Sequence, residues 1–235
     1  METLPDALAL AQTMVDIGKL AGKPVVAVIT SMAQPLGTHI GNALEVKDAI
    51  DVLAGRTQGD LLEISLLLGS HMLVLAEKAK TLPEARAMLE NALSSGVGLR
   101  KLAEMIAAQG GDPRVVEDLS LLPQAAVKRV MRAETAGYLS AMDTTALGMA
   151  AQRMGAGRAK KSDMLDYSVG YVLHVRLGDE VTEDTPLATL YARNEAEAEE
   201  AEKAIRKALT IAREKPQTPK LWDAVVTADG ITYNR

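Results

Sequence analysis

The stretch Pro24-Val-Val-Ala-Val-Ile-Thr-Ser31 decides the expected fold, because it is the clearest strand in the first half of the chain. Its run of β-branched residues is typical of a strand that is buried on both faces of a sheet. The segment before it predicts a helix, with Thr3 as the N-cap, apolar residues at helical spacing from Ala7 to Ala21, and Gly22 at the end. A helix followed by such a strand is half of a β-α-β unit, so the sequence indicates an α/β fold with a parallel-type strand.

Helical patterns fill most of the remaining first half. They are expected at Asn42–Leu53, Asp60–Lys80, Leu82–Leu93 and Gly98–Gln109. The glycines and proline of Gly110-Gly-Asp-Pro113 end the last of these helices. We therefore expect a domain boundary near residue 122, with a helix-rich part of an α/β domain over 1–122 and an α+β domain over 123–235.

The second half alternates short strands and helices. Strands are expected over 128–133, 137–142, 169–175, 187–192 and 222–227, with a short helix over 144–154. Asn194 and Glu197 form a capping-box pattern at the start of an acidic helix. The segment Gly155–Ser162 has two glycines, three positive charges and no apolar anchor, so we expect it to be the most mobile internal segment.

Composition excludes several classes of function. The 235 residues contain no cysteine, so disulfides, thiolate catalysis and cysteine-ligated zinc are excluded. A net charge of −5, no phenylalanine and one tryptophan disfavour a nucleic-acid partner. The apolar run Leu61–Ala76 is too short and too interrupted for a bilayer span, so no membrane partner is expected. With no basic leader followed by an apolar stretch, we expect a cytoplasmic protein.

No motif indicates an enzyme by its spacing alone. The sequence contains no GxxxxGK[ST] phosphate loop, no HExxH and no GxSxG. Gly155-Ala-Gly157 follows a predicted helix rather than a strand, so it fails the structural context of a dinucleotide-binding loop. The neighbouring Arg158, Lys160 and Lys161 are candidates for meeting an anion, and a solvated loop is the alternative interpretation.

Two long blocks carry a more specific signal. The first is Ser31-Met-Ala-Gln-Pro-Leu-Gly-Thr-His-Ile-Gly-Asn-Ala-Leu-Glu-Val-Lys-Asp-Ala-Ile50. The second is Gly155-Ala-Gly-Arg-Ala-Lys-Lys-Ser-Asp-Met-Leu-Asp-Tyr-Ser-Val-Gly170, followed by Gly178-Asp-Glu-Val181. In order and spacing these blocks resemble segments in the C-terminal half of the pyrimidine-nucleoside and thymidine phosphorylases, whose full chains are nearly twice as long.

This resemblance implies a fold and an activity. Members have a helical domain, a larger α/β domain and a C-terminal α+β domain with a barrel-sandwich or hammerhead-like sheet, and the active site lies in the cleft between the first two. They are pentosyltransferases of nucleoside salvage, in which phosphate attacks C1′ of uridine or thymidine and the pyrimidine leaves. The resemblance implies phosphate as co-substrate, no required cofactor and a homodimer. The choice between uridine and thymidine is made by a base pocket outside this chain.

The resemblance also implies that the catalytic residues lie outside this chain. In the family, a Lys-His-Ser stretch with following glycines cradles the phosphate, and an Arg, a Ser and a Lys hold the base, all upstream of the matching segment. The present sequence contains no Lys-His-Ser. We therefore expect an inactive chain that pairs with a second copy or with a complementary N-terminal half. If that half is missing, the strand Pro24–Ser31 should present an unpaired edge.

A potassium site is also implied by the resemblance. It places backbone-carbonyl ligands on Leu36 and His39 and a carboxylate ligand on Asp48, where family members carry Ala and Glu at the last two positions. Hard cations favour such oxygen ligands. The remaining ligands would come from the upstream half. The alternative for Asp48 is an exposed helix residue.

Parts of the sequence are also compatible with other classes of function. A non-catalytic scaffolding or regulatory module derived from this family is the alternative. The hairpin that begins at Gly178 resembles those of biotinyl and lipoyl carrier domains, but Tyr191-Ala-Arg-Asn194 offers no lysine for modification. Anthranilate phosphoribosyltransferase shares the catalytic architecture, and the block that begins at Gly155 argues against it.

Overall fold

The computed structural model describes residue 1 and residues 3–234, and it divides into two compact units. Unit 1 comprises Met1–Ser31, Gln58–Ser95 and Pro219–Arg235, and unit 2 comprises Met32–Thr57 and Gly96–Thr218. Each unit contains residues from both sides of position 122, so the division into units does not coincide with the expected domain boundary. That boundary stays a prediction.

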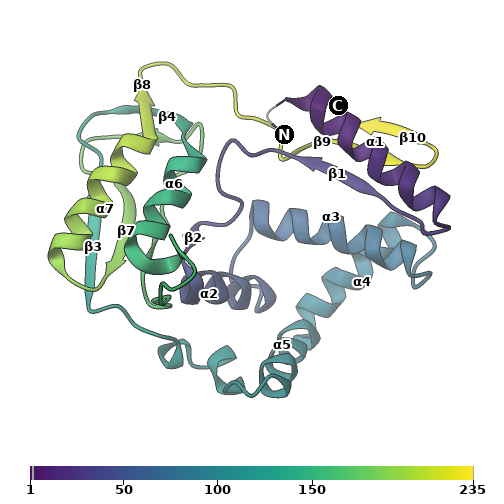
Figure 1. Ribbon diagram of the computed structural model, residues 1–235, viewed down its shortest axis with the longest axis horizontal. Helices are drawn as coiled ribbons and strands as arrows, with labels where there is room; N and C mark the ends of the chain where they lie inside the picture. Colours follow the sequence, from purple (N-terminus) through teal and green to yellow (C-terminus); the bar gives the residue numbers. More distant parts are fainter. Residues whose placement is uncertain (2, 235) are drawn as a thin grey trace. The chain divides into compact units, whose positions relative to one another are not determined.

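Unit 1 is a small three-stranded sheet accompanied by three helices. Its elements are α1 (Leu4–Leu20), β1 (Ala27–Thr30), α3 (Asp60–Leu75), α4 (Leu82–Ser94), β9 (Trp222–Thr227) and β10 (Gly230–Tyr233). The Thr3 hydroxyl caps α1 by accepting the Asp6 N–H, as the sequence predicted. Figure 1 shows α1 running alongside β1 and β9, where Val15 packs against Val226 in a small buried cluster.

The pairing of β1 differs from the sequence-based expectation. The α/β class is confirmed, but β1 runs antiparallel to β9, with Ala27 opposite Val226 and Val28 opposite Val225. The sheet order is β1-β9-β10, so β1 lies at a sheet edge within the part of the chain that the structure describes. A helix followed by a strand favours a parallel neighbour, but the actual neighbour comes from the other end of the chain, which no local pattern reveals.

Unit 2 contains two antiparallel sheets with helices packed on them. Its strands are β2 (His39–Ile40), β3 (Val127–Arg132), β4 (Gly137–Met142), β5 (Gly170–Leu173), β6 (Glu180–Val181), β7 (Pro186–Ala192) and β8 (Leu209–Ala212). Its helices are α2 (Asn42–Leu53), α5 (Val97–Ala108), α6 (Thr144–Ala151) and α7 (Glu195–Ala208), with short helical turns at Pro113–Val116, Leu119–Leu121 (η2) and Gln152–Ala156 (η3). The sheet orders are β2-β5-β7-β3 and β6-β4-β8.

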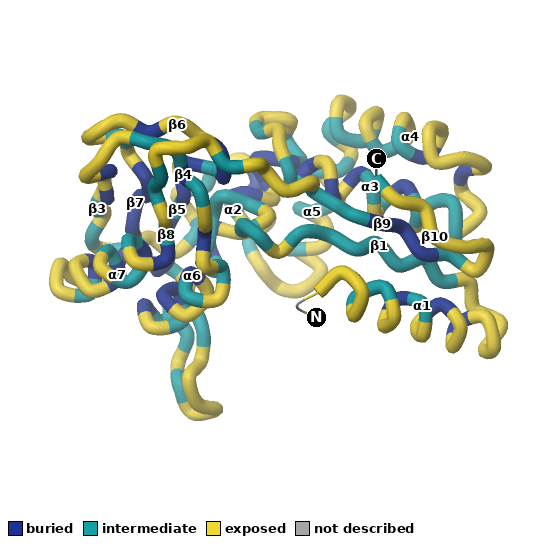
Figure 2. Tube along the Cα trace, turned by 90° about the horizontal axis from the view of Figure 1, so that it is seen from above, coloured by how far each residue is buried: buried dark blue, intermediate teal, exposed yellow. Residues whose placement is uncertain are grey.

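The main hydrophobic core lies in unit 2. Side chains from both sheets, such as Tyr171, Leu190 and Leu139, pack against Leu147 of α6 and Ile205 of α7. Figure 2 shows β5 and β7 as mostly buried strands. This core is what fixes the loops of unit 2 that are described below.

Most predicted helices are confirmed. The bounds of α2 match the prediction, and the Asn194 side chain caps α7 by accepting the Glu197 N–H at 3.0 Å. The helix expected to reach Lys80 ends earlier, at Leu75, and a left-handed residue, Glu77 with φ of 56°, follows shortly after.

Within the described residues, no helix combines the length and the apolar character that a bilayer crossing requires.

Candidate functional site

The two sequence blocks at 31–50 and 155–170 lie against each other in unit 2. The Asn42 side chain donates to the Ala156 carbonyl oxygen at 2.9 Å. The Ala43 N–H donates to the Tyr167 carbonyl oxygen at 3.1 Å. These bonds anchor the start of α2 to Ala156, within the segment Gly155–Ser162, and to Tyr167, after it.

Two glycines allow this close contact. Gly41 and Gly170 have φ of +133° and +147°, which residues with a side chain rarely adopt. A Cβ on Gly170 would stand 2.1 Å from the Ile40 carbonyl oxygen, and one on Gly41 would stand 2.4 Å from the Val169 carbonyl oxygen. The two backbones therefore touch where β2 pairs with β5.

Arg176 and Leu177 hold the irregular segment before β2, residues 34–36, by hydrogen bonds. The Arg176 guanidinium donates to the carbonyl oxygens of Pro35 at 2.7 Å and of Leu36 at 3.4 Å. The Leu177 N–H donates to the Gln34 side-chain oxygen at 3.0 Å. Both family-like blocks and the chain before Gly178 thus form one connected structure.

A cluster of charged side chains joins β2 to α2. The His39 Nδ1 lies 3.5 Å from an Asp48 carboxylate oxygen and 3.0 Å from the Thr38 hydroxyl, and the Lys47 ammonium lies 3.4 Å from His39 Nε2. Burial lowers the pKa of His39, and Lys47 adds to this effect, while Asp48 opposes it. The imidazole is therefore neutral near pH 7.

Asp51 is the best-partnered carboxylate of this cluster. It accepts hydrogen bonds from the Lys47 ammonium at 2.9 Å and from the Arg56 guanidinium at 2.7 Å. Burial acts to raise the pKa of Asp51, but the hydrogen bonds from these two cations outweigh it and hold the pKa below its ordinary value. This ion-pair network fixes the end of α2.

The three expected potassium ligands are only partly brought together. Asp48 is buried, so the alternative of an exposed helix residue is wrong. However, its carboxylate faces His39, and the Leu36 carbonyl oxygen accepts from Arg176. Two of the three ligand groups thus already face nitrogen atoms, and potassium binding at Leu36, His39 and Asp48 stays a prediction. The described residues contain no group of three or more His, Asp or Glu side chains that could hold a metal.

The basic loop is exposed but locally ordered by hydrogen bonds. Arg158, Lys160 and Lys161 are exposed and form no ion pair within residues 3–234. The Lys160 N–H donates to Asp163, and the Gln152 side chain donates to the Arg158 carbonyl oxygen at 2.6 Å. The anion-binding role of these three cations and the mobility of the loop stay predictions.

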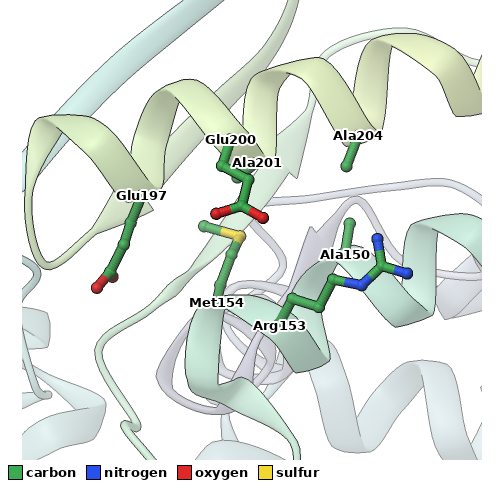
Figure 3. Close-up of a pocket in the computed structure, with 7 residues that line it drawn as sticks. All are labelled: Ala150, Arg153, Met154, Glu197, Glu200, Ala201 and Ala204. Atoms are coloured by element: carbon green, nitrogen blue, oxygen red, sulfur yellow. The ribbon is translucent and has the colours of Figure 1, made fainter.

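A small hollow lies between α7 and the α6–η3 segment (Figure 3). Arg153 and Met154 line one side, and Glu197 and Glu200 of α7 line the other. The facing alanines Ala150, Ala201 and Ala204 leave the space open. At about 70 Å³ it is too small for a nucleoside, so it is not a substrate pocket.

Comparison with known proteins gives the family. Residues 138–212 match the pyrimidine nucleoside phosphorylase C-terminal domain, and residues 2–99 match the a/b domain of a glycosyl transferase family. The chain is 49% identical, over 195 residues, to the pyrimidine-nucleoside phosphorylase of Geobacillus stearothermophilus. The chain belongs to the pyrimidine-nucleoside phosphorylase family.

Two further relatives within this phosphorylase family match almost the whole chain. It is 46% identical to the pyrimidine-nucleoside phosphorylase of Bacillus subtilis (strain 168) and 42% identical to that of Staphylococcus aureus (strain USA300), each over 227 residues. These matches cover 97% of this chain and 52% of each relative, and the Geobacillus match covers 83% and 45%. The chain spans about half the length of the curated relatives it matches.

Within this chain, the block at 31–50 belongs to the a/b-domain match and the block at 155–170 to the C-terminal-domain match. The bond between Asn42 and Ala156 therefore joins the two matched regions. Sequence reasoning missed Arg176, because its partners lie far away in the sequence. The Lys47–Asp51 ion pair was also missed, although its i,i+4 spacing on a predicted helix is a signal that indicates such a pair.

Proposed function

We propose that this chain is the C-terminal portion of a pyrimidine-nucleoside phosphorylase. In the proposed reaction, a phosphate oxygen bonds to C1′ of uridine or thymidine and the bond from C1′ to the base nitrogen breaks. The base departs with the electron pair and takes up a proton, leaving (deoxy)ribose 1-phosphate. The observation that carries the proposal is the 46% identity over 227 residues, which span both matched domain regions.

The chain's own contribution is positioning rather than chemistry. The contacts of Asn42, Arg176 and the Gly41–Gly170 crossing hold the segment 31–41 in a fixed shape. Phosphorolysis also needs cations around phosphate and donors at the departing base. The family supplies these from its Lys-His-Ser stretch and from its Arg, Ser and Lys, none of which this chain matches. We therefore propose that the chain alone does not turn over nucleosides.

The proposed assembly is a cytoplasmic enzyme in which a complementary N-terminal portion supplies the residues that this chain lacks. Pairing with a second copy, as in the family's homodimer, does not replace that portion. The relatives' length supports the complementary portion, since the chain covers about half of it. Potassium at Leu36, His39 and Asp48 stays an implication of the resemblance, and the proposed function makes no use of it.

The test measures uracil or thymine released from uridine or thymidine in phosphate buffer. The chain alone should release no base above background, whereas the intact Bacillus subtilis relative serves as the active control. A turnover of about 10 per second by the chain alone would contradict its proposed inactivity.

Complementation separates the phosphorylase from the alternative. Adding the upstream portion of the Bacillus subtilis relative should restore base release. The matched variant Asn42→Ala, which removes the bond to Ala156, should restore less. A chain that binds this portion but stays inactive would instead favour a scaffolding or regulatory module.

A further inference from the structure

A larger hollow of unit 2 has the size of a small-molecule site. It has a volume of about 370 Å³ and lies between the start of α2, the η2 turn and the paired strands β3 and β7. Leu44 and Leu122 supply apolar surface, and Lys47, Lys128 and Tyr191 supply polar or aromatic groups. Pockets for small ligands begin at about 300 Å³.

The charge of this hollow favours an anion. Two lysines line it, and the nearby Asp118 and Asp166 carboxylates, which are not lining residues, each accept a hydrogen bond from a lining serine. Lys47 is already neutralised by Asp51 at 2.9 Å. Lys128 lies opposite Tyr191 in the β3–β7 pair, with its ammonium 5.7 Å from the ring centre, and it forms no ion pair with any described residue. Its charge is therefore available to an anionic ligand.

The remaining polar groups are acceptors. The Ser120 and Ser168 hydroxyls each donate their hydrogen to an aspartate at 2.6 Å, so toward the hollow their oxygens can only accept. The Gln124 amide nitrogen donates to the Leu119 and Leu122 carbonyl oxygens, which leaves its side-chain oxygen as an acceptor. Acceptors of this kind suit a ligand that carries hydroxyl groups.

We propose that this hollow binds a sugar phosphate. The phosphate meets the Lys128 ammonium, and the sugar hydroxyls donate to Ser120, Ser168 and Gln124. The apolar side chains cover the carbon faces of the sugar. The proposal rests on the lining of the hollow and stands whether or not the chain takes part in phosphorolysis.

The test is isothermal titration calorimetry on the whole chain with ribose 5-phosphate as the probe. Saturable binding with a Kd of about 1 mM or below is expected. Lys128→Met should weaken it by at least about tenfold, because one charge-assisted contact is lost. The matched control is Lys101→Met, whose side chain is exposed on α5 and pairs with Glu104, and it should leave the Kd unchanged.

Further arms test the ligand class. Ribose and inorganic phosphate should each bind at least about tenfold more weakly than ribose 5-phosphate. Ala125→Trp, which fills the hollow, should abolish binding while the circular dichroism spectrum stays native. The proposal is overturned by no binding at about 10 mM probe, by equal binding of inorganic phosphate, or by an unchanged Kd in Lys128→Met.

Discussion

At the scale of single residues, the crossing of Gly41 and Gly170 is the tightest backbone contact described above. Gly170→Ala should lower the free energy of unfolding by about 2–4 kcal/mol, because the new Cβ meets the Ile40 carbonyl oxygen and φ is +147°. Gly22→Ala is the control, since its φ is +65° but nothing lies within 4 Å, and it should cost only about 1–2 kcal/mol. Urea denaturation measures both. Equal losses would show that backbone conformation alone, without the crossing, sets the cost.

Asp51 makes part of the stability depend on pH. Its folded-state pKa is lowered, so its stabilisation is present above the ordinary carboxyl pKa of about 4 and is lost as pH falls through the lowered value. Asp51→Asn should cost about 1–2 kcal/mol at pH 7 and progressively less in acid. Urea denaturation at pH 7 and in acid checks this. The exposed Glu214→Gln should change little at either pH, and a loss for Asp51→Asn that does not shrink in acid would refute the linkage.

The site shows what a sequence can reveal at this scale. The resemblance implied a shared potassium ion for the His39 carbonyl and Asp48, not the imidazole–carboxylate contact that the structure shows, whereas the Lys47–Asp51 pair follows from helical spacing. The contacts of Arg176 join residues about 140 positions apart, so they depend on tertiary structure that no local pattern encodes. The same holds for the lining of the larger hollow.

At the scale of elements, the capped helix α7 offers a simple test. Asn194→Ala should destabilise the chain by about 1 kcal/mol, because the Glu197 N–H loses its acceptor at the helix start. Thermal unfolding followed by circular dichroism measures this. The exposed Glu200→Gln on the same helix keeps the cap and should cost less, and an equal loss would contradict the capping argument.

Helices were easier to predict than strands. Caps and apolar periodicity define a helix locally, which explains why the bounds of α2 and the start of α7 are confirmed. The strands β2, β6, β8 and β10 were not predicted, and β2 and β6 have only two residues each, too few for an alternating pattern. The antiparallel pairing of β1 was missed because a strand's neighbour is a property of the whole chain.

At the scale of the whole molecule, unit 1 carries an apolar helix face. Met14 and Ile17 of α1 are 53% and 61% exposed, and Leu10 on the same stripe is 44% exposed. We expect the chain alone to self-associate at micromolar concentration, since burying this face removes apolar surface from water.

Sedimentation velocity decides this expectation. The double variant Met14→Lys and Ile17→Glu should sediment as a monomer of 25.0 kDa. Met164→Glu is the control, because Met164 is 90% exposed but lies outside α1, and it should still associate. A monomeric wild-type chain would contradict the expectation that the exposed apolar face of α1 drives self-association.

The pairing of β1 with β9 also affects how the protein is made. The ribosome releases β9 long after β1, because the two strands lie far apart in the sequence, so the sheet of unit 1 cannot form until the chain between them has emerged. Unit 2 ends at Thr218 and can complete its core first. During that interval, the inner face of α1 has no complete sheet to cover it, so we expect the nascent chain to expose this apolar surface. Translation order thus sets folding order, with unit 1 last to become native.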